Sequence, residues 1–333
     1  MTESDDTRAA SSTVRRALLI GIDDYVTFPT LDACCSDVER LRPLLERHAD
    51  GRPNFEVTTL LSGGDVLSEA RLTQALKAFF AASDDTPPAD VLLLYFAGHG
   101  AYDAAERSGY LVAQDGVTDN YGIGMERLIG YANRARARHK VIALDCCHAD
   151  AVDNSFATGG LVSLADGVVV LAATRDEEEA IEAEAGGVFT TLLAAALDGA
   201  AADPVTGAVS VANVHGYIDA ALGGGEQSPT FKANIASWCV VRQTEPIVPR
   251  ETVLRLTKYF ERPTDELPLG VEPPEARPGE PIDEVTADIQ ALREAGLIKP
   301  VGHEGEYTAA LGRGACLTPL GRYYWKRVQD ARF

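Results

Sequence analysis

The sequence predicts an α/β fold, in which a doubly wound and mostly parallel sheet is flanked by helices, followed by a smaller α+β module. Three observations support this prediction. Apolar runs alternate with segments whose apolar residues recur at helical spacing, from residue 16 to residue 222. Most of these runs are continuous, as in parallel strands that are covered on both faces. A Pro-rich and acidic stretch then separates this region from a second set of elements.

The individual elements follow from these patterns in order along the chain. Strands are expected at the apolar runs 16–21, 55–63, 89–97, 139–147 and 167–174. Helices are expected at 31–49, 68–83, 123–137, 187–200 and 209–222. Residues 109–116 form either a short hairpin or an edge strand, and residues 228–241 close the first domain. Because helices alternate with strands, the crossovers are expected to be right-handed.

Composition divides the chain into three regions. Residues 1–13 are polar and acidic and are expected to be disordered. Residues 14–243 carry the α/β pattern. Residues 244–333 begin with a proline-containing linker and form a second domain, within which residues 262–281 are too rich in Pro and acidic residues for regular structure.

The C-terminal region shows the order helix, helix, β-type wing and final aromatic helix between residues 251 and 330. This order resembles the winged-helix modules of bacterial regulators, which implies a small winged-helix-like α+β domain. The helix that would enter the major groove opens with Asp283, Glu284 and Asp288, whereas DNA readers place Arg, Lys, Asn or Gln there. We therefore expect this domain to bind a regulatory protein rather than DNA.

The overall charge limits the classes of partner. The chain has 50 Asp and Glu against 30 Lys and Arg, and this acidic field repels nucleic acid and anionic membranes. The basic stretch 133–140 lies on a helix that leads into a strand and is interpreted as a solvated face. The absence of a signal-type or membrane-spanning apolar run predicts a cytoplasmic protein. Six cysteines without a CxxC pair indicate reduced thiols rather than disulfides or a zinc ribbon.

Two strand ends carry residues suited to nucleophilic chemistry. In open parallel sheets, ligands bind beyond the carboxyl ends of the strands. His99 follows one apolar run, and Cys147 ends another, 48 positions later. A histidine within hydrogen-bond reach of a cysteine promotes thiolate formation or protonates a leaving amine. The backbone amides of Gly100 and Cys147 are placed to hold an oxyanion, so the pattern indicates acyl transfer.

A structural interpretation of the same residues is a buried thiol and a core histidine, because free cysteine is among the most buried residue types. The location of both His99 and Cys147 at strand ends, with glycine on both sides of the histidine, favours the functional interpretation. Cys146, Cys34 and Cys35 are assigned to packing, since adjacent cysteines chelate metals poorly. His148 is assigned a structural role.

Four motifs carry a family resemblance. "YFAGHG" and "DCCHA", downstream of "ALLIGIDDY" and "LDACCSDVERL", resemble the caspase-like cysteine peptidases, and among them the metacaspases and their bacterial relatives. The resemblance covers about residues 14–243, and the family places its histidine about 50 residues before its cysteine. It implies that His99 is the catalytic histidine and Cys147 the nucleophile. Cys146 fills a variable position, and Asp150 stands where metacaspases usually have Gly.

The resemblance also implies a specificity. Asp145 occupies the position of a glutamine that lines the pocket for aspartate in caspases proper. Asp37, with Cys34 as its companion, matches a metacaspase position that lines the same pocket. Two carboxylates in one pocket bind a cation and repel an acidic side chain, so cleavage after Arg or Lys is expected. A structural alternative for Asp37 is a carboxylate favoured by the helix dipole.

No cofactor is expected to be required, but calcium is a candidate activator. Metacaspases often bind calcium through clustered aspartates, and the resemblance suggests Asp115, Asp119, Asp150 and Asp153. The acidic run 175–185 is either a solvated loop or an acidic rim of the substrate cleft.

Together these features predict a cysteine endopeptidase that cleaves protein or peptide substrates after Arg or Lys, in bacterial signalling or defence by resemblance. Arg242 and Arg250 in the linker are candidates for autoprocessing. The alternatives are a catalytically silent caspase-like scaffold and a winged-helix transcriptional regulator.

Overall fold

The computed structural model describes residues 14–81, 88–146, 163–173, 187–222, 229–268, 284–301 and 314–333. The chain divides into two compact units. The first comprises the chain up to Ala201 together with Val209–Gln243, and the second comprises Ala202–Ala208 together with Thr244–Phe333. The predicted N-terminal disorder concerns residues outside the described part. No helix within the described ranges is both long enough and apolar enough to span a membrane.

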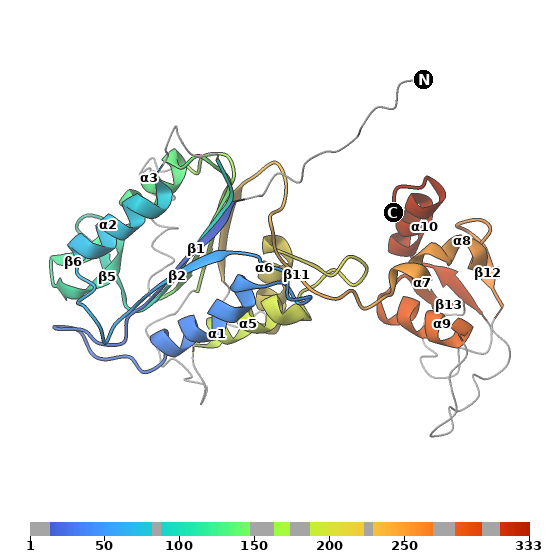
Figure 1. Cartoon of the computed structure of the whole chain (residues 1–333), viewed down its shortest axis with the longest axis horizontal. Helices are drawn as coiled ribbons and strands as arrows, with labels where there is room; N and C mark the ends of the chain where they lie inside the picture. Colours follow the sequence, from blue (N-terminus) through green and yellow to red (C-terminus); the bar gives the residue numbers. More distant parts are fainter. Residues whose placement is uncertain are drawn as a thin grey trace. The chain divides into compact units, whose positions relative to one another are not determined.

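A six-stranded sheet forms the centre of the first unit, in the order β10-β8-β7-β3-β1-β2 (Figure 1). All neighbouring strands are parallel except β10, which is antiparallel to β8. The predicted mostly parallel sheet is therefore confirmed. The strands are β1 (Arg15–Gly21), β2 (Glu56–Leu61), β3 (Ala89–Ala97), β7 (Ala137–Asp145), β8 (Val168–Ala172) and β10 (Thr230–Asn234).

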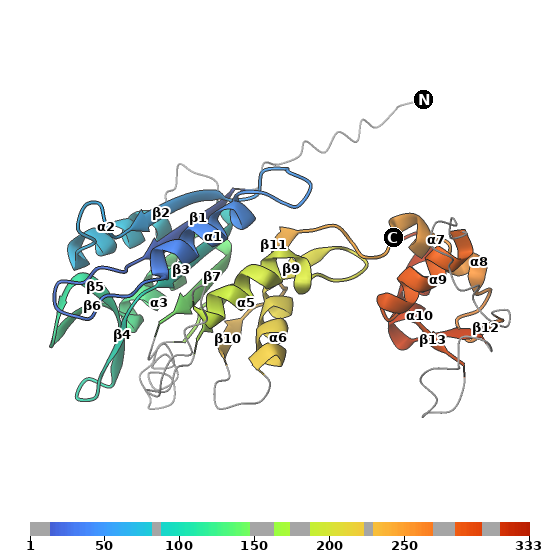
Figure 2. The same ribbon diagram turned by 90° about the horizontal axis from the view of Figure 1, so that it is seen from below.

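Helices cover both faces of this sheet, as Figure 1 shows. One face carries α2 (Glu69–Phe80) and α3 (Met125–Arg134). Figure 2 shows the other face, where α5 (Val188–Ala195) lies between α1 and α6. The helix α1 spans Cys34–Glu46, and α6 spans Val211–Leu222. The π-helix η1 (Ala196–Ala200) continues α5.

The side chains of the central strands alternate between these two faces, as the period of two in a strand requires. Leu94 and Phe96 of β3 pack in the core with the side chains of α2 and α3. Tyr95, between them in sequence, borders Leu41 of α1 and Leu193 of α5. Asp145 at the end of β7 shares the parity of Val141 and Ala143, which face α1 and α5. The alternation therefore directs Asp145 toward these two helices.

Two smaller sheets complete the first unit. The antiparallel sheet of β4 (Gly100–Asp103), β5 (Ser108–Val117) and β6 (Asn120–Gly124) shows that the segment near residue 110 belongs to a hairpin. The other sheet pairs β9 (Ala208–Ser210) with β11 (Val240–Gln243).

Part of the predicted helix 209–222 is a strand instead. Val209 and Ser210 belong to β9, and α6 begins only at Val211. Ser210 Oγ accepts a hydrogen bond from the backbone N–H of Asn213 at 3.1 Å, which is the behaviour of an N-cap residue. This capping serine fixes the start of the helix.

The basic stretch 133–140 leads from the end of α3 at Arg134 into β7, which begins at Ala137. Its three arginines are exposed, as expected, whereas His139 and Lys140 are buried. One prediction about basic residues is wrong. Arg242 does not lie in an exposed linker: it is buried in β11, and its Nη1 donates to the carbonyl of Leu197 at 2.7 Å. A protease reaches such a bond only after local unfolding. Arg250 is exposed at the start of α7.

The second unit contains a three-stranded antiparallel sheet in the order β12-β14-β13. Its core contains Phe260, Leu292 and Trp325, and also Val205 from the segment Ala202–Ala208. Its winged-helix identity stays a prediction. The elements are α7 (Arg250–Leu254), α8 (Leu256–Tyr259), β12 (Glu266–Leu267), α9 (Glu284–Glu294), β13 (Ile298–Pro300), β14 (Ala315–Leu317) and α10 (Pro319–Gln329).

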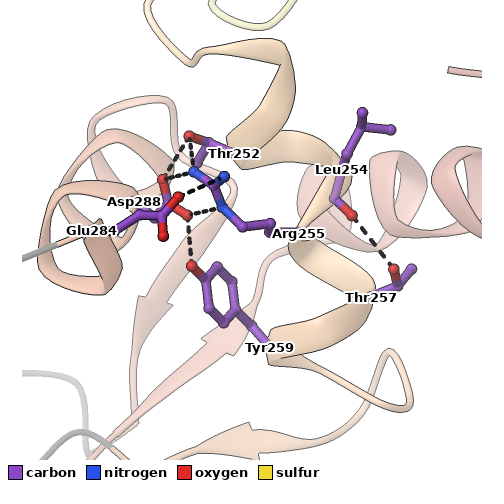
Figure 3. A network of polar contacts seen from close by, with 7 residues as sticks. All are labelled: Thr252, Leu254, Arg255, Thr257, Tyr259, Glu284 and Asp288. Carbon is purple, nitrogen blue, oxygen red and sulfur yellow. Dashed lines mark hydrogen bonds and ion pairs between the residues drawn. The ribbon is translucent and has the colours of Figure 1, made fainter.

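Asp288 of α9 is buried in a polar network and does not face solvent (Figure 3). Its carboxylate accepts two hydrogen bonds from Arg255, at 2.5 and 2.7 Å. It also accepts from the hydroxyls of Thr252 at 2.6 Å and Tyr259 at 2.5 Å. The sequence groups Asp288 with Asp283 and Glu284 as an argument against DNA binding, and burial by α7 and α8 removes Asp288 from that argument. Glu284 remains exposed, and Asp283 lies outside the described residues.

Candidate active site

The carboxyl ends of β3 and β7 meet at one edge of the sheet. Ala97 of β3 pairs with Asp145 of β7, and the backbone N–H of Gly98 donates to the carbonyl of Asp145 at 3.3 Å. His99 follows Ala97 by two positions, as Cys147 follows Asp145 in the sequence. Cys147 itself lies outside the described residues, as do His148, Asp150, Asp153 and the run 175–185.

The imidazole of His99 has a fixed orientation. Its Nε2 lies 2.8 Å from the carbonyl oxygen of Pro29. A carbonyl can only accept, so Nε2 carries the proton, and in the neutral ring Nδ1 is then the acceptor. The ring packs against Tyr25 and Phe28, with centroid separations of 4.8 and 5.9 Å. The loop after β1 therefore sets both the tautomer and the plane of the ring.

Tyr25 also fixes the backbone at His99. Its Oη accepts a hydrogen bond from the backbone N–H of His99 at 2.8 Å. Burial raises the pKa of Tyr25, so the hydroxyl stays protonated. A Cβ at Gly98 would lie 2.5 Å from this oxygen, so the close approach requires glycine. Gly100 begins β4 directly after His99, and the oxyanion role of its amide stays a prediction.

Asp145 is buried and held by a chain of hydroxyls. Thr190 of α5 donates to its Oδ2 at 2.7 Å. Because the Thr190 proton is used in this bond, the Tyr95 hydroxyl, 2.5 Å away, is the donor to Thr190 Oγ1. Asp145, Thr190 and Tyr95 are 5%, 0% and 0% exposed. The carboxylate is thus positioned from the sheet and from a helix that covers it.

Asp37 of α1 is the second buried carboxylate, and only 2% of it is exposed. Its Oδ2 accepts the backbone N–H of Gly187 at 3.1 Å. Its Oδ1 has no hydrogen-bond partner among the described residues, and Arg40 Nη1 lies 3.8 Å from it. Burial, together with the nearby charge of Asp145, raises the pKa of Asp37 to about 6. Asp37 and Asp145 are therefore two buried carboxylates whose charges influence each other, and their common substrate pocket stays a prediction.

The described cysteines near Asp37 and Asp145, which are Cys34, Cys35 and Cys146, are poorly suited to act as nucleophiles. The Asp23 carboxylate accepts the backbone N–H groups of Cys34 and Cys35, at 2.7 and 3.1 Å. Burial, with the charges of Asp23 and Asp145, raises the pKa of Cys34, so its thiol stays protonated. Cys146 is 1% exposed in the hydrophobic core, which supports its assignment to packing.

The proposed calcium ligands are only partly described. The Asp115 carboxylate accepts the backbone N–H of Glu69 at 2.9 Å, and Asp119 occupies a turn at a φ of 70°. No group of three or more His, Cys, Asp or Glu suited to a metal ion occurs within the described ranges. Since Asp150 and Asp153 lie outside those ranges, the calcium site stays a prediction.

The family of the chain follows from its match to a known domain. A family model of the caspase domain, a peptidase family, matches residues 14–237, which is more than half of the chain. The chain belongs to the caspase-domain family. This membership supports a function of the cysteine-peptidase type and implies a protein or peptide substrate. The match ends at residue 237, so the segment Thr244–Phe333, which forms most of the second unit, lies outside it.

Two further comparisons give no additional information about the function of the chain. No curated protein sequence matches the chain significantly. A crystal structure of protein GSU0716 from Geobacter sulfurreducens is 18% identical in sequence and has a TM-score of 0.48. The similarity covers 67% of this chain and 94% of that chain, and a similarity of this size supports no conclusion about function.

Several residues of the site were not identified from the sequence. Tyr25 follows the first predicted strand, so the rule that ligands bind beyond strand ends could have included it. Thr190 lies in a mostly apolar helical segment beside Thr191, so its polar side chain is a weak signal. Pro29 and Gly187 act through backbone groups, which leave no trace in a residue pattern.

Proposed function

We propose that the chain is a cysteine endopeptidase that cleaves protein or peptide substrates after Arg or Lys, with Cys147 as nucleophile and His99 as acid and base. The observation that carries this proposal is the pair of buried carboxylates, Asp37 and Asp145, near the edge of the sheet where β3 and β7 end. The family supports the reaction class, and these two carboxylates support the proposed specificity.

In the proposed reaction, the Cys147 sulfur attacks the scissile carbonyl carbon and forms a C–S bond. The carbonyl electron pair moves to oxygen, where the amides of Gly100 and Cys147 stabilise the negative charge. The C–N bond then breaks, and His99 gives the leaving amine the proton that came from the thiol. Water attacks the thioester and gives a proton to His99, and the sulfur leaves as a carboxylate product forms.

The contacts of His99 support these roles. Because Nε2–H donates to the Pro29 carbonyl, Nδ1 is the nitrogen available for proton transfer. The same carbonyl stabilises the imidazolium that forms after proton transfer, and the Tyr25 hydroxyl holds the backbone so that the ring cannot drift. The loop from Tyr25 to Pro29 therefore acts as a positioning element.

The charge of the pocket supports recognition of a basic side chain. Asp37 Oδ1 is buried without a hydrogen-bond partner among the described residues, which is costly for a charged oxygen. A guanidinium or ammonium group brings donors and a positive charge to this oxygen, while an acidic side chain adds repulsion. Binding of Arg or Lys thus relieves a cost that the free protein bears.

The test is digestion of a peptide library by the full chain, with cut sites mapped by mass spectrometry. The expected result is cleavage after Arg and Lys, lost in Cys147→Ala. Cleavage by Cys147→Ala would contradict the nucleophile, and a preference for Asp or for apolar residues would contradict the specificity. Parallel digests with calcium and with a chelator test calcium as an activator.

For the second unit we propose a regulatory role through a protein partner, in signalling or defence. No observation in the described part of the chain favours the catalytically silent scaffold or the transcriptional regulator over this proposal. A pull-down with the full chain and with its Cys147→Ala variant tests this role. The variant is expected to retain partners that the active enzyme would cleave.

A further inference from the structure

A cavity of about 230 Å³ lies at the amino ends of β1, β3 and β7. The nine residues of β3 separate this edge of the sheet from His99 by roughly 25–30 Å, so the cavity is distinct from the candidate active site. Its polar and aromatic lining comes from Arg15, Asp90, Arg138, His139, Trp238 and Cys239. Arg138 and His139 belong to the basic stretch that the proposed peptidase function does not use.

Two buried nitrogens beside this cavity lack partners. Nδ1 of His139 and Nε of Arg15 make no hydrogen bond within the described part of the chain. His139 is only 8% exposed. Buried polar groups in folded proteins are nearly always hydrogen-bonded, so two unpaired nitrogens on residues that line one cavity point to a ligand with acceptor atoms.

The cations of the cavity are arranged to receive an anion. Arg15 is fixed, because its Nη2 donates to the carbonyls of Val240 and Val241 and its guanidinium lies 4.4 Å from the centroid of the Phe55 ring. Arg138 is exposed and forms no hydrogen bond or ion pair with a described residue. One arginine is thus preorganised, and the other is available to close on a ligand.

The charge and shape of the cavity define the ligand class. Arg15 and Arg138 against Asp90 leave one net positive charge, because burial lowers the pKa of His139 and keeps its ring neutral near pH 7. Trp238 is 52% exposed and offers a flat apolar surface. Burial raises the pKa of Cys239 to about 12, so thiol chemistry is not expected there.

We propose that this cavity binds a small organic monoanion with a flat ring, of the aromatic carboxylate class. The carboxylate pairs with Arg138 and with the unpaired nitrogens of Arg15 and His139, and the ring stacks on Trp238. This proposal is independent of the peptidase function, because no residue of the candidate active site takes part.

The test uses the full chain labelled with 5-fluorotryptophan, observed by fluorine NMR. The chain has two tryptophans, and Trp325, buried in the second unit, is an internal control. Trp238→Phe assigns the two resonances. Benzoate is expected to shift only the Trp238 resonance and to saturate. Cyclohexanecarboxylate, which lacks the flat ring, and benzamide, which lacks the charge, are each expected to bind about tenfold more weakly.

Arg138→Gln is expected to weaken benzoate binding about tenfold. Arg52→Gln is the matched control, since Arg52 is an exposed arginine paired with Asp50 and does not line the cavity. Binding is expected to persist in Cys147→Ala and in the presence of an Arg peptide. The proposal is overturned if Trp238 shows no saturable shift, if benzamide binds as tightly as benzoate, if both arginine variants behave alike, or if the peptide competes.

Discussion

Asp37 in the first unit and Asp288 in the second are both buried carboxylates, only 2% and 4% exposed, but their surroundings are opposite. Asp288 accepts hydrogen bonds from Arg255, Thr252 and Tyr259. Asp37 accepts one backbone hydrogen bond, and its other oxygen has no hydrogen-bond partner among the described residues. The first carboxylate has hydrogen bonds to both oxygens, whereas the second has only a distant cation, Arg40 at 3.8 Å, beside its Oδ1.

The pKa values express the same contrast. For Asp288, desolvation would raise the pKa, but the hydrogen bonds from Arg255, Thr252 and Tyr259 outweigh it and lower the pKa to about 2. For Asp37, desolvation prevails and raises the pKa to about 6. A buried carboxylate whose oxygens all have hydrogen-bond partners indicates a structural role. A buried carboxylate that has an oxygen without such a partner, and that lies near a second carboxylate, indicates a binding role. Each prediction below tests one side of this contrast.

The largest expected effect concerns recognition. Asp37→Asn and Asp145→Asn should each lower kcat/KM for Arg and Lys reporter peptides about 100-fold, because each removes a charge-assisted bond to the substrate cation. Asp37→Asn should leave the melting temperature unchanged or higher, since the buried charge is costly. Cys146→Ala is the control and should retain most of the activity. Equal losses in all three variants would refute the acidic pocket.

The opposite result is expected at Asp288. Asp288→Asn should destabilise the second unit by about 3 kcal/mol, because it leaves the half-buried Arg255 without its main partner. The matched change Glu284→Gln removes an exposed partner of the same arginine and should cost less than about 1 kcal/mol. Urea unfolding monitored by Trp325 fluorescence in a Trp238→Phe background measures both. Similar costs for the two variants would show that the network is not a structural one.

A third prediction concerns acid stability. Because the folded pKa of Asp288 is about 2 and the ordinary value about 3.9, its stabilisation is fully present above about pH 5. This stabilisation, about 2.5 kcal/mol of unfolding free energy, is lost as the pH falls toward 2. The difference in unfolding free energy between the native chain and Asp288→Asn should therefore shrink over this range. A constant difference would indicate that the ion pair contributes nothing.

The smallest effect is expected at the residue that positions Asp145. Thr190→Val should lower kcat/KM for Arg reporters about tenfold, mainly through KM, because Asp145 loses a neutral hydrogen bond. Thr190→Ser should restore most of it. Thr191→Val is the neighbouring control, since Thr191 is exposed on the same helix and contacts Arg40. If Thr190→Val lowered kcat and left KM unchanged, Thr190 would instead act in the chemical step.

The sequence could predict what depends on pattern and spacing. The parallel sheet, the pairing of the strands that precede His99 and Cys147, and the acids Asp37 and Asp145 follow from apolar runs and family motifs. It could not predict backbone acceptors such as Pro29, or partners from a distant helix such as Thr190, because these depend on tertiary packing. The burial of Asp288 was missed for the same reason: its partner Arg255 lies 33 residues earlier.

The measurement that tests the contrast most directly is the pKa of Asp37, followed by carbon NMR of labelled carboxylates in the full-length Cys147→Ala variant and assigned with Asp37→Asn. In the free protein the pKa should be about 6. On addition of an Arg-containing peptide it should fall below the ordinary value of about 3.9, because the bound cation favours the ionised form. A pKa that stays near 6 with the peptide bound would contradict the assignment of Asp37 as a recognition residue.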